Sequence, residues 1–148
     1  DSSVLPHADP EDVREVLERV LRMVELLADS RGVTITVHAE DGCFVCSTQD
    51  EIQQVIYNLL DNAVKYSRDW GHVEVSLRQD SEWVILTVAD NGVGFDVERY
   101  MDDGKVHVGL INVRQRLAIR MHATVDVDST PGEGTTVTVT IPREKVNP

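Results

Sequence analysis

Hydrophobic residues follow two different periods along the chain. In three stretches they recur every three or four positions, which predicts amphipathic helices over about 9–31, 49–66 and 109–121. Elsewhere apolar and polar residues alternate, or short apolar runs are bounded by turns, which predicts strands at 33–38, 43–47, 72–79, 82–89, 123–128 and 135–141. Asp9 or Pro10 is expected to begin the first helix, with Pro10 in its first turn, and Gly32 to end it.

Two turn signals predict how neighbouring strands are connected. Asp41-Gly42 is a favoured hairpin dipeptide and would pair the two strands that flank it, and Gln79–Ser81 would do the same further along. The strand at 82–89 is apolar on both sides, so we expect it in the centre of a sheet. The element order predicts an α/β (α+β) two-layer sandwich, in which three helices cover one face of a mixed, mainly antiparallel sheet of about five strands.

The chain divides into one domain with two short ends. Residues 1–8 lack a period and are expected to be a linker, 9–142 form the domain, and 143–148 are a polar tail. Residues 96–108 also lack a clear period, and we expect a mobile loop there.

Composition excludes several classes of function. The 148 residues carry a formal net charge of −12, which opposes attraction to nucleic acid or anionic lipid. The longest apolar runs fall far short of the roughly 20 residues of a membrane span, and we expect neither a signal peptide nor direct membrane contact.

Cys43 and Cys46 lie three apart on a predicted strand and would face opposite sides, which favours structural cysteines over a metal or redox site. Trp70 and Trp83 are expected to pack rather than to stack on bases.

The polar edge of the second helix carries the first candidate site. At about 100° per residue, Asn58, Asn62 and Lys65 fall within roughly 60° of one another beside the apolar stripe. One interpretation is that they are scattered surface residues. The other is that the carboxamide oxygens ligate a hard cation such as Mg²⁺, while the Lys65 ammonium pairs with a phosphate oxygen.

Glycine-rich segments supply the other candidates. Asp90-Asn-Gly92-Val-Gly94 is either an ordinary turn or a place where a flat ligand approaches the backbone, with Asp90 accepting a hydrogen bond from an amino group such as that of adenine. The segment 104–110 begins the third helix, whose N-terminal N–H groups suit phosphate, although alone it favours a plain helix start. The segment 132–136 alone indicates a tight turn.

In this order, the four segments resemble the N, G1, G2 and final glycine boxes of the GHKL, or Bergerat-fold, ATPases. They most closely resemble the catalytic ATP-binding domain of bacterial sensor histidine kinases in two-component signalling. The run NLLDNAVKYS from Asn58, followed by DNGVGFD from Asp90, carries the resemblance. The second glycine box departs from the usual G-x-G-L-G-L and keeps only Gly109-Leu110, similar to kinases that read H-I-G-L-x-N-V-x-x-R-L.

The resemblance implies a role for each residue. Asn62 would ligate Mg²⁺, Asn58 would help to hold metal and phosphates, and Lys65 would face phosphate; these three would form the catalytic set. Asp90 would bind the adenine amino group. Residues 97–108 would form the ATP lid. The other residues implied to contact the nucleotide are Tyr66, Gly92, Gly94, Lys105, His107, Val108, Gly109, Leu110 and Thr135.

Position 58 bears on the mechanism. In the gyrase-like and chaperone relatives a Glu there acts as general base toward water, whereas the amide of Asn58 cannot take a proton at neutral pH. We therefore expect negligible ATP hydrolysis and transfer of the γ-phosphoryl group to a histidine of a separate dimerisation domain. His7, in LPHADP, does not match the acceptor context H-E-x-R.

The resemblance thus implies a monomeric, cytoplasmic fragment of a longer kinase, with ATP, Mg²⁺, the dimerisation domain and a response regulator receiver domain as partners. Two alternatives stay open. An anti-sigma-factor-type serine kinase has the same fold but usually carries Glu in place of Asn58. A non-catalytic ATP-binding sensor module would fit the thinned second glycine box.

Overall fold

A computed structural model describes residues 10–94 and 120–144. Its elements in chain order are β1 (Pro10–Asp12), α1 (Val13–Arg31), β2 (Thr34–Ala39), β3 (Phe44–Cys46), α2 (Gln49–Lys65), β4 (His72–Gln79), β5 (Trp83–Asp90), β6 (Thr124–Thr130) and β7 (Gly134–Pro142). The loop predicted at 96–108 and the predicted third helix as far as residue 119 lie outside the described residues. Within the described ranges no helix is both long and apolar enough to cross a bilayer.

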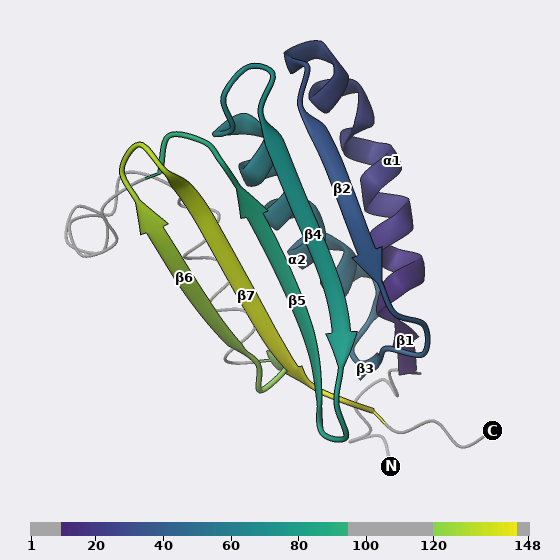
Figure 1. The fold of residues 1–148 in the computed structure, drawn as a ribbon. Helices are drawn as coiled ribbons and strands as arrows, with labels where there is room; N and C mark the ends of the chain where they lie inside the picture. The colour runs from purple at the N-terminus through teal and green to yellow at the C-terminus, as the bar shows by residue number, and fades with distance from the viewer. Residues whose placement is uncertain (1–9, 95–119, 145–148) are drawn as a thin grey trace.

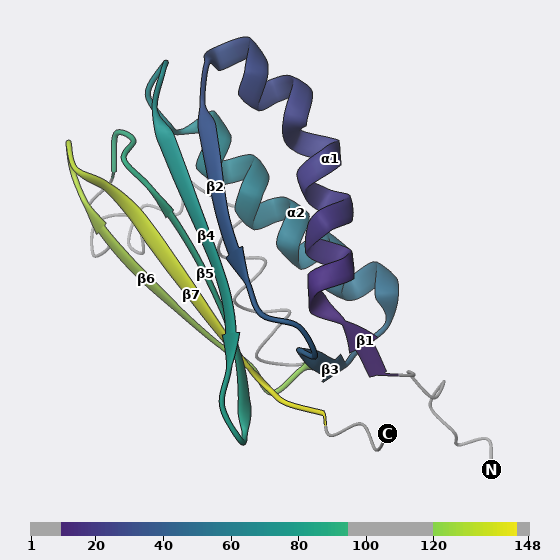
Figure 2. The ribbon, with the colours of Figure 1, turned by 45° about the vertical axis from the view of Figure 1, so that its right-hand side comes forward.

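Five strands form the main sheet, in the order β2-β4-β5-β7-β6 (Figure 1). The pairs β4–β5, β5–β7 and β7–β6 are antiparallel, and β2 pairs parallel with β4. The strand β5 is central, as its apolar character predicts. Both α1 and α2 lie on one face of this sheet (Figure 2). The predicted α/β two-layer architecture with a mixed, mainly antiparallel sheet is therefore confirmed.

The hydrophobic core lies between the two helices and the sheet. Alternate residues of β4, such as Val73 and Val75, are buried, while Glu74 and Arg78 between and beyond them are exposed. The predicted apolar stripes supply the helical half of the core, with Val13, Val16, Leu17, Val20, Val24 and Ala28 from α1 and Ile52, Val55, Ile56, Leu59, Leu60, Ala63 and Val64 from α2. The one-sided pattern read from the sequence thus positions both helices on the sheet.

Two predictions about the N-terminal half are wrong. Pro10 lies in the short strand β1, which pairs with β3, and the helix begins at Val13 after the Asp12 cap. Asp12, and not the predicted Asp9, is the N-cap of this helix, because the Asp12 side chain accepts a hydrogen bond from the N–H of Arg14 at 3.0 Å. The Asp41-Gly42 turn does not make a hairpin, since β2 pairs with β4 and β3 pairs with β1. A local turn signal does not fix the pairing partner when a longer strand offers a better one.

The prediction for the two cysteines agrees with the structure, whereas the prediction for the tryptophans does not hold for Trp70. Cys43 is buried and Cys46 exposed, as their spacing predicts, and burial raises the pKa of the Cys43 thiol to about 11. Trp70 is 85% exposed, so the prediction that it packs is wrong as far as the core is concerned. Its ring lies next to Gly32, where a Cβ atom would come within 2.4 Å of the ring. Trp83 lies at the start of β5 and is 36% exposed.

Candidate functional site

A cleft lies between the C-terminal half of α2, the end of β5 and the start of β7. Its lining has an apolar part, made of Leu59, Ala63, Val88 and Val137, and a polar part, made of Asn62, Tyr66, Asp90 and Thr135. Segments that are distant in the sequence therefore meet here, and four of the residues predicted to bind a nucleotide share one cavity.

Asp90 is the last residue of the central strand. The strand register places it opposite Thr135, and its Oδ1 accepts a hydrogen bond from the Gly92 N–H at 2.8 Å. Burial raises the pKa of the Asp90 carboxyl above its ordinary value, while hydrogen bonds from the backbone of Gly92 and Thr135 act in the opposite direction. The cleft therefore contains a partly desolvated carboxyl group that accepts hydrogen bonds when ionised.

Glycines allow the three segments to approach closely. A Cβ atom on Gly92 would lie 2.1 Å from the carbonyl oxygen of Tyr66, and one on Gly134 would lie 2.1 Å from the carbonyl oxygen of Asp90. Gly134 also has a φ of 125°, which disfavours any side chain. The next residue after Gly92, Val93, donates its N–H to the same Tyr66 oxygen at 3.2 Å. The loop after β5 is thus fitted against the end of α2 by backbone contacts.

Gly94 belongs to the neighbouring turn rather than to the cleft lining. Its φ is 64°, and a Cβ atom there would lie 2.0 Å from the carbonyl oxygen of Thr130. Gly132 donates its N–H to the carbonyl oxygen of Val93 at 2.6 Å. These contacts hold the loop after β5 against the β6–β7 turn, so Gly94 contributes to the position of this loop and not to the cleft lining.

The amide of Asn62 has a polar atom that is buried without a partner. Its Nδ2 finds no hydrogen-bond acceptor among the described residues. An unpartnered buried amide is costly unless something else satisfies it. Because Asn62 also lines the cleft, a polar ligand in that cleft would supply the missing partner.

Asn58 and Lys65 do not line this cleft. At about 100° per residue, they lie on one side of Asn62 around the helix axis, and the lining residues Tyr66 and Leu59 lie on the other. The Nζ of Lys65 is 3.2 Å from Oδ2 of Asp61, and the Lys65 side chain is 56% exposed. The hydrogen bond and charge of Asp61 raise the pKa of Lys65. The structure therefore groups Asn62 with Asp90 and leaves Asn58 and Lys65 along the adjacent helix edge.

Sequence reasoning missed the apolar lining of the cleft. It assigned Leu59 and Ala63 to the buried stripe of the helix and gave Val88 and Val137 no role beyond packing. A period of two would have found both valines, since Val88 lies two residues before Asp90 and Val137 two after Thr135, on the same face of the sheet. The predicted ligands Lys105, His107, Val108, Gly109 and Leu110, and the predicted lid, lie outside the described residues.

Comparison with known proteins identifies the family. Residues 47–145 match the family described as "Histidine kinase-, DNA gyrase B-, and HSP90-like ATPase", and the chain belongs to that family. It is similar to the sensor histidine kinase WalK of Bacillus subtilis, with 30% identity over 84% of this chain and 24% of WalK. It is also similar to the adaptive-response sensory kinase SasA of Crocosphaera subtropica, with 35% identity over 66% of this chain and 29% of SasA. The chain thus spans about a quarter of the length of these two relatives.

Solved structures share the fold. The catalytic domain of the histidine kinase ThkA superimposes with a TM-score of 0.80 and 16% identity over 91% of this chain and 96% of that domain. The histidine kinase AdeS of Acinetobacter baumannii gives a TM-score of 0.80 and 22% identity over 97% of this chain and 71% of its own. The described sheet and helices therefore have the architecture of histidine kinase catalytic domains.

Proposed function

We propose that this domain binds Mg·ATP in the cleft and donates the γ-phosphoryl group to a histidine of a separate dimerisation domain, from which a response regulator would receive it. The observation that carries the proposal is the meeting of Asp90 and Asn62 in one cleft with an apolar lining. Membership of the ATPase family supports the nucleotide, and the kinase relatives support the type of reaction.

The cleft has the chemistry that an adenine ring requires. A flat aromatic base would lie against Leu59, Val88 and Val137, and its amino group would donate a hydrogen bond to the Asp90 carboxylate. Guanine has a carbonyl oxygen at the corresponding ring position, which a carboxylate would repel. We therefore expect this site to prefer adenine over guanine nucleotides.

The residues along the helix edge fit the triphosphate and its cation. Neutral amide oxygens suit Mg²⁺, so Asn62 and Asn58 would hold the ion, which supplies charge neutralisation on the phosphates when it is bound. The unpartnered Nδ2 of Asn62 is a hydrogen-bond donor, so it would suit a phosphate oxygen, while the Oδ1 of the same amide would ligate the ion. Lys65 would exchange its exposed pairing with Asp61 for a phosphate oxygen.

Transfer, rather than hydrolysis, follows from the residue at position 58. The amide of Asn58 cannot take a proton from water, so a water molecule in the site would not be activated there. In the transfer step a histidine nitrogen of the dimerisation domain bonds to the γ-phosphorus while the bond to the bridging oxygen of ADP breaks. This chain would contribute by positioning the donor and neutralising its charge.

Calorimetric titration with ATP tests the binding site. Asp90→Asn should weaken ATP binding by about 10- to 100-fold, because it removes a hydrogen bond to a charged acceptor. The variant should still fold, since an amide oxygen can accept the Gly92 N–H as the carboxylate does. Unchanged affinity in a folded Asp90→Asn domain would show that the adenine assignment is wrong.

Labelled ATP tests the reaction. Incubation with a histidine-bearing dimerisation domain should give an acid-labile phosphoprotein, whereas an anti-anti-sigma protein should stay unlabelled. An acid-stable product on the second substrate would instead support a serine kinase. Binding without transfer to any dimerisation domain would support a non-catalytic sensor. Steady ATP hydrolysis by the isolated domain, abolished by Asp90→Asn, would contradict the role given to Asn58.

A further inference from the structure

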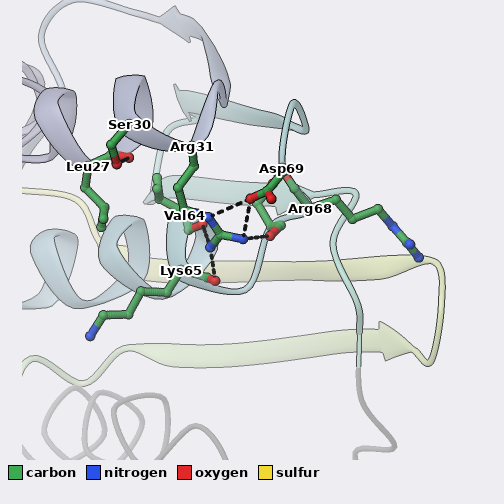
Figure 3. A network of polar contacts seen from close by, with 8 residues as sticks. Leu27, Ser30, Arg31, Val64, Lys65, Arg68 and Asp69 are labelled. Atoms are coloured by element: carbon green, nitrogen blue, oxygen red, sulfur yellow. Dashed lines mark hydrogen bonds and ion pairs between the residues drawn. The ribbon is translucent and has the colours of Figure 1, made fainter.

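Arg31, in the last turn of α1, reaches across to the end of α2 (Figure 3). Its Nη1 donates to the carbonyl oxygen of Val64 at 2.8 Å and also to that of Lys65, and its Nη2 donates to that of Ser67 at 2.6 Å. The guanidinium also lies 3.4 Å from the carboxylate of Asp69, and the Arg31 side chain is only 27% exposed. A single side chain of α1 therefore binds two carbonyl groups at the end of α2 and one in the turn that follows it.

Two of these carbonyl groups, those of Val64 and Lys65, belong to the last turn of α2, where a helix has no N–H donors of its own left to offer; that of Val64 also accepts the Ser67 N–H at 3.3 Å. The first helix solves this problem with Gly32, which has a φ of 69°. The second has no such glycine and ends at Tyr66, with φ −96° and ψ 4°. A cation at a helix C-terminus is favourable in its own right. The geometry of the last turn of α2 thus depends on an arginine from another element.

The same turn carries part of the nucleotide cleft. Tyr66 lines the cleft, and its N–H donates to the carbonyl oxygen of Asn62 at 3.0 Å. The carbonyl of Tyr66 faces the loop after β5, where it accepts the Val93 N–H at 3.2 Å and leaves no room for a side chain on Gly92. A shift of this turn would therefore move the loop that is hydrogen-bonded to Asp90.

Arg68 connects the turn after α2 to two further loops of the domain. Its Nε donates to the carbonyl oxygen of Asn91 at 3.2 Å, and its Nη2 donates to that of Gly132 at 2.7 Å. In Figure 3 the Arg68 side chain extends away from the Arg31 network. The turn after α2 is thus held to α1 by Arg31 and to the loops after β5 and β6 by Arg68.

We propose that Arg31 is a positioning residue for the nucleotide site. It fixes the last turn of α2 and, through the Tyr66 carbonyl, holds the Gly92-Val93 segment against Asp90. Arg31 is not part of the cleft lining, so it acts through the turn and not by contact with the ligand. This inference rests on the proposed ATP site and extends it by giving α1 a part in nucleotide affinity.

Three variants test the inference by calorimetric titration with Mg·ATP, at a temperature where each is fully folded. Arg31→Met should weaken binding about tenfold, because the carbonyl groups lose a charged donor. Arg31→Lys keeps the charge but not the fork of donors, so it should recover part of that loss. Arg22→Met, an exposed position on the same helix, should bind as the parent does. Parent-like affinity of folded Arg31→Met would overturn the proposal.

Amide hydrogen exchange without nucleotide supplies a second, independent readout. In Arg31→Met the Val93 amide should exchange faster, whereas the Thr87 amide in the middle of β5 should keep its protection. Equal acceleration at both amides would mean that Arg31 only stabilises the fold, which would contradict positioning. If the parent itself bound no ATP, the proposed function would fail, and the Val93 result would still decide whether Arg31 positions the loop.

Discussion

The two sides of Asn62 on α2 are built in different ways. On one side lies what we call the adenine flank, after the base proposed to bind there. It consists of Leu59, which is buried in the core, and of Tyr66 and Asp90, which are partly buried and accept hydrogen bonds from the backbone of the loop after β5. On the other lies the phosphate flank, Asn58 and Lys65, where Lys65 is largely exposed and paired with Asp61. The proposed base site is thus assembled by the fold itself, whereas the proposed phosphate side depends on side chains that would rearrange around a ligand. Changes on the two flanks should consequently affect different quantities.

Gly92→Ala should have the largest effect, and it falls on the adenine flank. The added methyl would lie 2.1 Å from the Tyr66 carbonyl oxygen, so the loop must shift away from α2. We expect the free energy of unfolding to fall by about 3 kcal/mol, near the upper end for overpacking, and ATP binding to weaken. Urea denaturation measures the first effect. Val93→Ala is the matched control, since that side chain is 51% exposed, and it should change stability by no more than about 0.5 kcal/mol.

Asn62→Ala, a change at the residue that lies between the two flanks, should lower the affinity for ATP. Loss of the amide should cost about 2 kcal/mol of ATP affinity in the presence of Mg²⁺ and much less in its absence. Stability should not fall, because the variant removes a buried amide nitrogen that has no partner among the described residues. Titrations with and without Mg²⁺, together with the melting temperature, measure both. Equal losses in the two titrations would argue against a metal ligand at this position.

The pH dependence of ATP binding should come from the adenine flank. The ionised carboxylate of Asp90 is the proposed acceptor for the adenine amino group, and protonation weakens it as an acceptor. The affinity for ATP should therefore decrease as the pH falls through the pKa of Asp90. Because burial raises that pKa, the decrease should begin at a higher pH than for an ordinary aspartate. Calorimetry across a pH series measures this, and Asp90→Asn should abolish that component of the dependence.

The same shift has the opposite consequence for folding. An acid whose pKa is higher in the folded than in the unfolded state stabilises the fold at low pH, and this contribution is lost as the pH rises through the folded pKa. Asp90→Asn should therefore be at least as stable as the parent at neutral pH. A clear loss of stability at neutral pH would contradict this account of the Asp90 environment.

Lys65→Met should have the smallest effect. Exposed ion pairs such as Lys65–Asp61 contribute little to stability, so the urea midpoint should be unchanged. ATP affinity should fall by about fivefold at low ionic strength and less in high salt. A large loss of stability would mean that the pair with Asp61 is structural and that the two flanks are less distinct than described.

The sequence predicted the adenine flank better than the phosphate flank. Asp90 was singled out because it ends a strand that is apolar on both faces and is followed by two glycines, whereas Thr135 was implied only by the family resemblance, since its segment alone indicates a tight turn. The Asp90 signal is a backbone signal, and the backbone decides where that residue lies. Helical spacing correctly placed Asn58, Asn62 and Lys65 along one edge, but it could not show that the cleft opens on one side of Asn62 only.

Strand pairings and contacts between residues that are far apart in the sequence could not be predicted from the sequence. Asp41-Gly42 read as a hairpin because turn chemistry is local, while the choice of β4 as the partner of β2 is made by the whole sheet. Arg31 gave no signal, because nothing in its neighbourhood reveals that its guanidinium meets carbonyl groups more than 30 residues away. Such residues become visible only when helix ends are examined for the groups that satisfy their carbonyls.

The convergence of Asn62 and Asp90 on one Mg·ATP molecule can be tested most directly by nuclear magnetic resonance with Mn·ATP in place of Mg·ATP. Paramagnetic broadening should be strongest for the side-chain amide signals of Asn62 and Asn58, and the Gly92 and Val93 amides should shift in the diamagnetic Mg·ATP complex. The Asn62 signals should be affected less in Asp90→Asn at the same nucleotide concentration. Broadening centred elsewhere on the domain, with the Asn62 amide unaffected at saturation, would contradict the account.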